Sequence, residues 1–296
     1  MTGKIVRIQR FSTTNGPGLR STVFVKGCPL TCHWCHNPEM QESKKQLMVY
    51  PEQCKACGIC VKTCEHGGHS FVDGKHIVDR TNCVLCGKCE QMCPHSAIEL
   101  AGQDVEASEV LERLLRDRPF YDSSKGGITI SGGEPLAQFN FTKELLQLCK
   151  AEGLHTCLDT SGWGGRAAEL VQWVDLYLWD FKESDPERHK YYTGVELEPI
   201  LDSLQKMNDA GGKCLLRCPI IPGVNDRDAH LEAIAELANR MPCIQVIDLV
   251  PYHRLGVAKA DAIGMHQDEF SSLTQDEKDH FLSVVTAKTN TQARWI

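Results

Sequence analysis

Three cysteines lie close together near the amino terminus, Cys28, Cys32 and Cys35, with three and then two residues between them. A β-type run directly precedes them. On a loop, thiolates at this spacing can surround one small inorganic centre. A cubane cluster has four irons, so three cysteines leave one iron without a protein ligand. An open metal position is where chemistry takes place, by the logic that separates catalytic from structural zinc sites.

The same stretch has an alternative interpretation as a zinc knuckle. His33 or His36 would then supply the fourth ligand beside the three cysteines, since structural zinc is commonly held by four cysteine and histidine ligands. The residues that follow favour the iron–sulfur interpretation.

A duplicated cysteine module extends from Cys54 to Pro94. Each copy has the spacing Cys-x2-Cys-x2-Cys-x3-Cys, which is the pattern of two-cluster bacterial ferredoxins, where the fourth cysteine of each run ligates the other cluster. The first expected [4Fe–4S] centre is held by Cys54, Cys57, Cys60 and Cys93, and the second by Cys83, Cys86, Cys89 and Cys64. Each centre would have four protein ligands, so it should pass electrons and not bind substrate. A pair of zinc sites is the alternative, and Glu65 departs from the proline that follows the second copy.

Composition excludes several classes of function. The chain has 296 residues and a net charge of −7, without a long basic run, so nucleic acid is not an expected partner. The amino terminus has no apolar segment typical of a signal peptide. The chain also has no run of about 18 apolar residues, which a membrane-spanning helix would need. The protein is therefore expected to be cytoplasmic, with no membrane partner. There the clustered members of its 16 cysteines should serve as metal ligands and not form disulfides.

Five further cysteines have no mutual spacing. They lie in helical or strand patterns, where a buried cysteine commonly behaves as a small apolar residue. No role is assigned to Cys149, Cys157, Cys214, Cys218 and Cys243.

Helix and strand patterns alternate from about Glu106 onward. Helices are expected over 105–116, 139–152, 166–173, 200–210, 229–240 and 275–286. Strands are expected over 5–9, 21–26, 127–131, 154–159, 176–182, 214–220 and 245–250. This serial order with short connections implies a parallel sheet.

There are too few units for a complete eight-unit barrel. The expected fold class is α/β, a partial (β/α)6 TIM-type barrel with an inserted bacterial-type 2[4Fe–4S] ferredoxin domain. The barrel would comprise residues 1–48 and 104–296, and the insert residues 49–103.

Polar residues gather at the carboxyl ends of the expected strands, where sites in such barrels lie. They are Glu134, Asp159, Asp180, Lys182 and His253, together with the three-cysteine loop after the strand over 21–26. His230 lies just beyond a loop, at the start of an expected helix.

These residues carry a resemblance to a known family. Cys28-x3-Cys32-x2-Cys35 with Gly132-Gly133-Glu134-Pro135 resembles the radical S-adenosylmethionine superfamily. Five further segments are similar to the glycyl radical enzyme activating enzymes: Asn15–Arg20, Trp34–Glu39, Asp159–Gly162, Asp180–Lys182 and Pro251–Gly256. Asn15 stands where the family often has aspartate. The similarity covers essentially the whole chain, and the ferredoxin-type insert distinguishes it from pyruvate formate-lyase activase.

The resemblance implies a reaction. The open iron would bind the amino and carboxylate groups of S-adenosylmethionine, and an electron would break the S–C5′ bond. The resulting 5′-deoxyadenosyl radical would abstract a hydrogen from a glycine of a partner glycyl radical enzyme. The implied cofactors are three [4Fe–4S] clusters and S-adenosylmethionine. A flavodoxin or ferredoxin is the expected reductant, and the chain is expected to be a monomer.

The resemblance also implies roles for individual residues. Cys28, Cys32 and Cys35 would hold the catalytic cluster. Gly132 and Gly133 would let the backbone approach the methionine portion.

Further cofactor contacts follow in the same way. Glu134 would orient its loop or accept from the ligand's amino group, and Lys182 would pair with the carboxylate. The other implied contacts are Trp34 and His36 beside the adenine and the cluster, and Asp180, Phe181 and His230. Asp159, Thr160 and Asp180 match positions that hold a monovalent cation in relatives.

Three competing functions explain less of the chain. A polyferredoxin-type electron carrier would leave the barrel and the Gly132–Glu134 loop without a use. A zinc-organised binding module would not explain the duplicated spacing. A radical S-adenosylmethionine enzyme acting on a small molecule is the closest rival, and the segments Trp34–Glu39 and Pro251–Gly256 argue against it.

The three cysteine sets predict the iron content. Anaerobically reconstituted protein should carry about 12 irons, which corresponds to three cubanes. Iron and acid-labile sulfide analysis measures this content, and Cys149→Ala is the control that should leave it unchanged. A stable content near four irons in folded protein would contradict the assignment of the insert.

Overall fold

The computed structural model describes residues 1–296, and a nine-stranded sheet forms its centre. The strands run across this sheet in the order β13, β12, β11, β10, β9, β8, β2, β1, β7. Their bounds are β1 Thr2–Ser12, β2 Arg20–Val25, β7 Gln103–Glu106, β8 Gly127–Gly132, β9 His155–Thr160, β10 Leu176–Asp180, β11 Cys214–Ile220, β12 Ile244–Pro251 and β13 Gln292–Trp295.

The core of the sheet is parallel. The six consecutive strands from β2 through β8 to β12 are parallel neighbours, and they coincide with six strands expected from the sequence. The α/β class with a parallel core is thus confirmed. β1 pairs antiparallel with both β2 and β7. β13 adds a parallel strand that was not predicted, and the sheet ends at β13 and β7 without closing into a ring.

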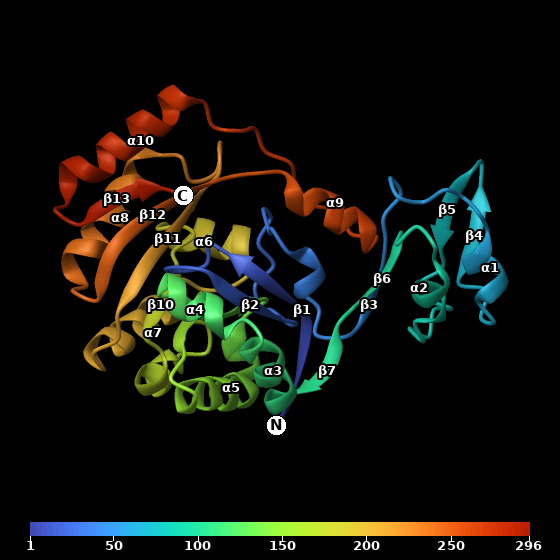
Figure 1. Ribbon diagram of the computed structural model, residues 1–296. Helices are drawn as coiled ribbons and strands as arrows, with labels where there is room; N and C mark the ends of the chain where they lie inside the picture. The colour runs from blue at the N-terminus through green and yellow to red at the C-terminus, as the bar shows by residue number, and fades with distance from the viewer.

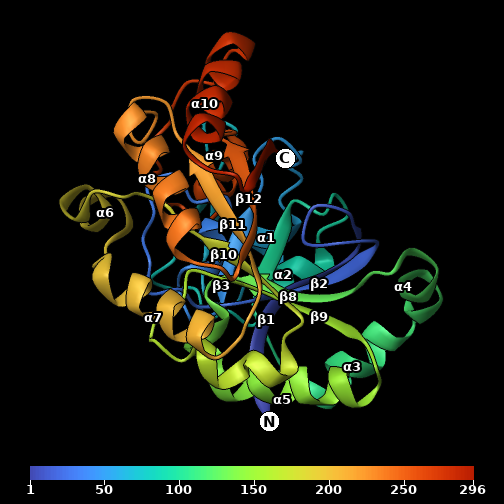
Figure 2. The ribbon, with the colours of Figure 1, turned by 90° about the vertical axis from the view of Figure 1, so that its left-hand side faces the viewer.

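Helices surround the outside of this sheet (Figure 2). They are α3 Ala107–Leu115, α4 Arg118–Ser124, α5 Phe139–Ala151, α6 Pro186–Thr193, α7 Glu198–Asp209, α8 Asp228–Arg240, α9 Leu255–Ala262 and α10 Gln275–Lys288. The short 3₁₀ helices are η1 Pro38–Met40, η2 Pro135–Gln138 and η3 Ala167–Trp173. η3 occupies a position where an α-helix was expected. α4, α6 and α9 were not predicted.

The buried faces of these helices and of the strands form one main core of 43 residues. All residues of β8 except the last are buried, because the strand lies at the centre of the sheet and is covered on both faces. Leu145 and Leu146 of α5 and Leu204 of α7 are fully buried in the same core. None of the helices is both long and apolar enough to span a membrane.

A smaller unit projects from the sheet on a two-stranded ribbon (Figure 1). β3 (Gln46–Val49) and β6 (Ile98–Ala101) form this ribbon, with Gln46 opposite Ala101. Between them lie α1 (Ile59–Thr63), the hairpin of β4 (His69–Val72) and β5 (Lys75–Val78), and α2 (Lys88–Met92). The unit has its own small core, in which Cys60 and Cys89 are buried beside Leu47, Val49 and Ile98.

The two cysteine runs of this unit adopt the same backbone conformation. Each short helix is preceded by a glycine in the left-handed region, Gly58 with φ 73° and Gly87 with φ 77°. Each helix ends at the fourth cysteine of its run, where Cys64 and Cys93 share φ values of −82° and −79° and an identical ψ of 108°. The sequence repeat is therefore a structural repeat as well.

Candidate active site

The carboxyl ends of the parallel strands open onto a cavity with an empty volume of about 2110 Å³. Most of the residues that the sequence analysis singled out line it. They are Cys28, Cys32, Trp34, Cys35, His36, Gly132, Gly133, Glu134, Asp159, Thr160, Asp180 and Lys182. The structure thus brings together residues that are separated by up to about 150 positions in the chain.

The three-cysteine loop leaves β2 and is held by backbone hydrogen bonds on two sides. Cys28 N donates to Gln41 O at 2.8 Å on one side, and Thr31 N donates to Thr193 O at 2.8 Å on the other. The carbonyl of Cys35 accepts from Gln267 Nε2 at 2.9 Å. Gly256 of α9 packs so closely on that carbonyl that a Cβ would lie 2.0 Å from it. This loop is therefore fixed by the fold.

The burial of these three cysteines favours metal-bound thiolates over free thiolates. Burial raises the pKa of Cys32 to about 12, and it also raises the pKa values of Cys28 and Cys35. Free thiols here would stay protonated, whereas a bound iron–sulfur cluster stabilises the deprotonated form. All three line the same cavity.

The Gly132-Gly133-Glu134 loop continues the pairing of β8 with β2 past the end of both strands. Gly133 N donates to Val25 O and Glu134 N to Gly27 O, each at 2.9 Å. A Cβ on Gly133 would lie 2.3 Å from Gly27 O. Gly132 has φ +118°, and its Cβ would lie 2.4 Å from Val25 O. Contact with the neighbouring strand is therefore a reason for both glycines in addition to the ligand approach predicted from the resemblance.

Glu134 is almost completely buried and organises the adjacent strand end. Its carboxylate accepts from Thr160 Oγ1 at 2.5 Å, from Ser161 N at 2.9 Å and Ser161 Oγ at 2.6 Å, and from Leu136 N at 3.0 Å. Burial raises the pKa of Glu134, and these hydrogen bonds oppose that rise. The orienting role expected for this residue agrees with this geometry.

Four charged side chains form two ion pairs in the cavity. Lys182 Nζ lies 2.8 Å from Asp180 Oδ2, and Arg217 Nη1 lies 3.4 Å from Asp159 Oδ2. Burial acts to lower the pKa of Lys182, but the carboxylate of Asp180 and other nearby groups raise it overall, so Lys182 is cationic. Asp159 also accepts from Ser131 Oγ at 2.7 Å. The pair of Asp159 with Arg217 already balances the charge at the expected monovalent-cation position.

Aromatic and imidazole rings line the wall beside the cysteines. Trp34 packs in an apolar cluster with Ile221 and Tyr252. The ring of His36 lies 4.2 Å from that of His253, edge to face, and burial lowers the pKa of His36 to about 3. His36 is therefore neutral over the physiological pH range.

Two of the predicted cofactor contacts lie outside the cavity lining. Neither Phe181 nor His230 lines the cavity. Phe181 belongs to the main core and stacks on the ring of His230. His230 is fully buried, and its Nδ1 accepts from Ser184 N at 3.1 Å. Residue 181 points away from the cavity because Asp180 and Lys182, on either side of it in an extended segment, point into it.

The sequence analysis missed some residues of this cavity. His253 was placed at a strand end, where the site was expected, but was given no role, and it lines the cavity. Arg217 was not singled out, although alternation along Cys214–Ile220 could have placed this cation on the cavity face. Lys259, whose Nζ donates to His36 O at 2.9 Å, comes from α9, a helix that was not predicted.

In the projecting unit, the first predicted set of cysteines lines a second cavity of about 310 Å³. Its lining includes Cys54, Cys57, Cys60 and Cys93. In the second set, Cys64 and Cys83 come from different copies of the repeat, and both lie beside Gly68. The backbone N of Gly68 donates to Cys64 Sγ at 3.3 Å. The lining of the first cavity thus combines three cysteines of one copy with Cys93 of the other, and their role as cluster ligands stays a prediction.

Comparison with known proteins identifies the family. The sequence profile of the radical SAM superfamily matches residues 82–238. The benzylsuccinate synthase activating enzyme of Thauera aromatica is 43% identical over 269 residues, which cover 88% of this chain and 81% of that protein. The (2S)-3-sulfopropanediol dehydratase activating enzyme of Klebsiella oxytoca is 40% identical over 273 residues, covering 89% and 86%. The chain belongs to the glycyl radical enzyme activating enzymes of the radical SAM superfamily.

A solved structure supports the fold of this activating enzyme. A radical SAM methyltransferase from Sphaerobacter thermophilus aligns with a TM-score of 0.57 at 13% sequence identity, covering 99% of this chain and 76% of that one. The resemblance found in the sequence is thus confirmed, and with it the class of oxidoreductase that activates a glycyl radical enzyme. Membership implies one [4Fe–4S] cluster and S-adenosylmethionine as cofactors.

The buried hydrogen bonds of Glu134 predict that this side chain matters first for the structure of the site. Glu134→Ala should lower the free energy of unfolding by about 1–3 kcal/mol, because the donors of Thr160 and Ser161 lose their acceptor. It should also weaken S-adenosylmethionine binding. Anaerobic denaturation and equilibrium binding measure the two effects. Glu112→Ala on the exposed face of α3 is the control, and equal stability of the two variants would contradict the role of Glu134.

Proposed function

We propose that this activating enzyme generates a glycyl radical on a partner enzyme by reductive cleavage of S-adenosylmethionine at the cavity. The observation that carries the proposal is that the Cys28–Cys35 loop and the Gly132–Glu134 loop meet at the same end of two paired strands. When bound, the cluster supplies the electron that splits S-adenosylmethionine into methionine and the 5′-deoxyadenosyl radical, which takes a hydrogen from the partner's glycine. The remaining work is binding, orientation and exclusion of side reactions by this chain.

The cysteine loop suits a cluster with one open iron. Cys28, Cys32 and Cys35 line one cavity, and their burial disfavours any anionic form other than a metal-bound thiolate. These three residues would hold the cluster. The volume beside them is large enough for a nucleoside and an amino acid together.

The charged groups of the cavity suit the methionine end of the cofactor. Lys182 is cationic and lies on the same wall as the cysteines, so it would pair with the carboxylate. Asp180, which holds Lys182 in place, and the Gly132–Glu134 loop face the same space. A monovalent cation at Asp159, Thr160 and Asp180 stays a prediction.

The apolar and neutral groups suit the adenosine end. Trp34 offers an aromatic surface beside the cysteines, and neutral His36 with His253 adds a hydrogen-bonding wall.

We further propose that residues 49–103 are a ferredoxin-type insert that holds two additional [4Fe–4S] clusters and conducts electrons to the barrel. The cavity lined by Cys54, Cys57, Cys60 and Cys93 and the matching conformations of the two runs support this assignment. Cys57 and Cys86 are exposed, which suits exchange of electrons with a flavodoxin or ferredoxin. We expect a monomeric enzyme, with barrel parts at 1–48 and 104–296.

The unclosed sheet suits a substrate that is part of a protein. Because the edge strands β13 and β7 do not pair, the cavity is not enclosed by a complete ring of strands. A backbone loop of the partner could enter and place a glycine Cα near C5′ of the nucleoside. Glycine suits this because no side chain blocks the approach to its Cα hydrogen.

Cysteine variants should separate the roles of the two metal-binding regions. Cys32→Ala should abolish formation of 5′-deoxyadenosine, because the catalytic cluster loses a ligand. Cys57→Ala and Cys86→Ala should impair reduction while leaving S-adenosylmethionine binding in place. Chromatographic detection of 5′-deoxyadenosine and equilibrium binding measure these effects. Cleavage of the cofactor by Cys32→Ala at the parent rate would show that the catalytic cluster lies elsewhere.

Isotope transfer tests the identity of the substrate. Anaerobic mixing with a glycyl radical enzyme encoded beside this chain, S-adenosylmethionine and reductant should give a glycyl radical signal in electron paramagnetic resonance. Deuterated glycine in that partner should move deuterium into 5′-deoxyadenosine. Partner in which the glycine is replaced by alanine is the control. Transfer of hydrogen from a small metabolite instead would support the rival function, a radical SAM enzyme with a small substrate.

A further inference from the structure

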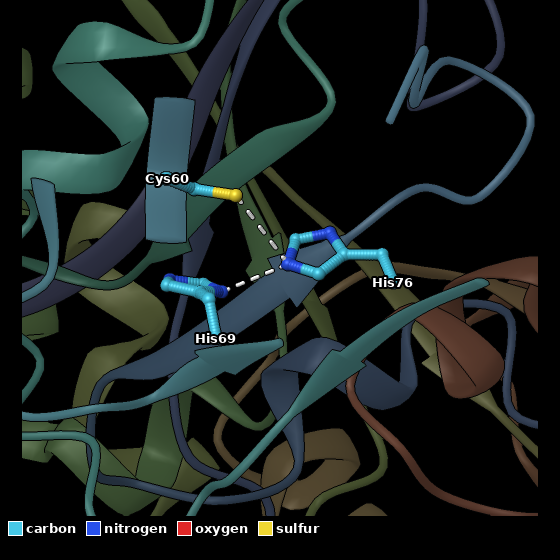
Figure 3. A group of neighbouring side chains, drawn as sticks. All are labelled: Cys60, His69 and His76. Carbon is cyan, nitrogen blue, oxygen red and sulfur yellow. Dashed lines mark hydrogen bonds between the residues drawn. The ribbon is translucent and has the colours of Figure 1, made fainter. Parts of the chain in front are cut away.

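A pair of histidines lies against the first insert cavity and has no part in the function proposed above. His76 on β5 lines this cavity together with the cysteines, and His69 on β4 stands behind it (Figure 3). His76 Nδ1 lies 3.8 Å from Cys54 Sγ, and His76 Nε2 lies 3.6 Å from Cys60 Sγ. One imidazole therefore bridges two of the four cysteines expected to hold the first cluster.

His69 fixes which way this imidazole donates. His69 Nδ1 and His76 Nε2 are 2.9 Å apart, so one of the two neutral rings donates a hydrogen bond and the other accepts it. If His69 donates it, His76 carries its own hydrogen on Nδ1 and directs it at Cys54 Sγ. In this arrangement Nε2, which also lies 3.6 Å from Cys60 Sγ, is satisfied by the hydrogen of His69, whereas the opposite arrangement leaves Nδ1 without a donor, facing Cys54 Sγ. The first arrangement is favoured for this reason.

The ring of His76 is also held in place from its face. Phe71 stacks on it with ring centroids 5.0 Å apart and planes 21° apart. His69 is buried, and the β4–β5 hairpin pairs in register with Phe71 opposite His76. The imidazole is thus preorganised toward the sulfurs by the hairpin, without needing the metal to orient it.

The second set of cysteines has no comparable neighbour. Cys64 Sγ accepts from the backbone N of Gly68 at 3.3 Å, and none of Cys64, Cys83, Cys86 and Cys89 has an imidazole hydrogen-bonded to its sulfur. The two runs share one backbone conformation, so the hairpin histidines are a difference added to a repeated framework.

We propose that His76, positioned by His69, donates a hydrogen bond to Cys54 Sγ at the first insert cluster. This bond makes the first cluster easier to reduce than the second. Hydrogen bonds to cluster sulfurs are one of the factors that set iron–sulfur reduction potentials, because they stabilise the added negative charge. An electron entering the insert would then reside mainly on the first cluster. The inference rests on the proposed two-cluster insert.

Potentiometric titration monitored by electron paramagnetic resonance tests the inference. The protein used is the full-length chain in which Cys28, Cys32 and Cys35 are replaced by alanine, so that only the insert clusters remain. The parent should contain about eight irons and give two separate midpoint potentials. His76→Phe keeps the ring and removes the donor. At a potential equal to the parent's higher midpoint, His76→Phe should have about a tenfold lower ratio of reduced to oxidised first cluster. This change corresponds to a midpoint about 59 mV lower for a one-electron couple. The lower midpoint should not move.

Three further variants complete the design. His76→Gln retains an N–H donor and should restore most of the potential. His69→Phe should shift the same midpoint in the same direction by less. His66→Phe changes an exposed histidine two residues after Cys64 and should shift neither midpoint.

Different results overturn different statements. Unmoved midpoints in both His76→Phe and His69→Phe, with iron near eight, overturn the role of the histidines and leave the two-cluster insert standing. If His76→Phe assembles no first cluster, His69→Phe carries the test, and an unmoved higher midpoint in that variant, with iron near eight, also overturns the role of the histidines. Parent protein without insert iron, or with zinc bound at Cys60, His69 and His76, overturns the insert assignment and the inference together.

Discussion

The parallel pairing of β2 with β8 is the constraint on which the candidate site depends. Its register places Val25 opposite Gly132, although about a hundred residues separate the two strands in the chain. Beyond that pair the backbones stay bonded, with Gly133 on Val25 and Glu134 on Gly27. The loop that carries the cysteines and the Gly132–Glu134 loop, both of which line the cavity, therefore start from one shared point, and neither can move without the other.

Glu134 extends this constraint to the next strand. Its carboxylate accepts from Thr160 and Ser161 at the end of β9, so three consecutive strand ends are joined by main-chain bonds and one buried side chain. The ends of β9, β10 and β11 then contribute charges in opposite pairs, Lys182 with Asp180 and Arg217 with Asp159. The cavity is polar yet nearly balanced, so a zwitterionic ligand could enter without leaving a buried charge alone.

Much of this could be predicted because the sequence patterns are local. Spacing identified the cysteine sets, and the strand expected over 176–182 placed Asp180 and Lys182 at its carboxyl end. Alternation along that strand could have placed Phe181 on the opposite face. The burial of His230 against Ser184 could not be predicted, because a loop separates His230 from its strand and only packing decides which way it turns. α6 was missed because its residues have almost no apolar period, and β13 because its pairing with β12 depends on contacts far away in sequence.

The ribbon of β3 and β6 leaves the barrel and returns to it at the same place. Gln46 and Ala101 are partners across this ribbon, so the chain ends on either side of the projecting unit are separated by about one strand spacing, roughly 4.8 Å. A tight turn could join them without disturbing β1, β2 or β7. The unit is thus a module that an ancestor could gain or lose in one genetic event, with the barrel's topology unchanged. The projecting unit can accordingly change without altering the strands that carry the cavity.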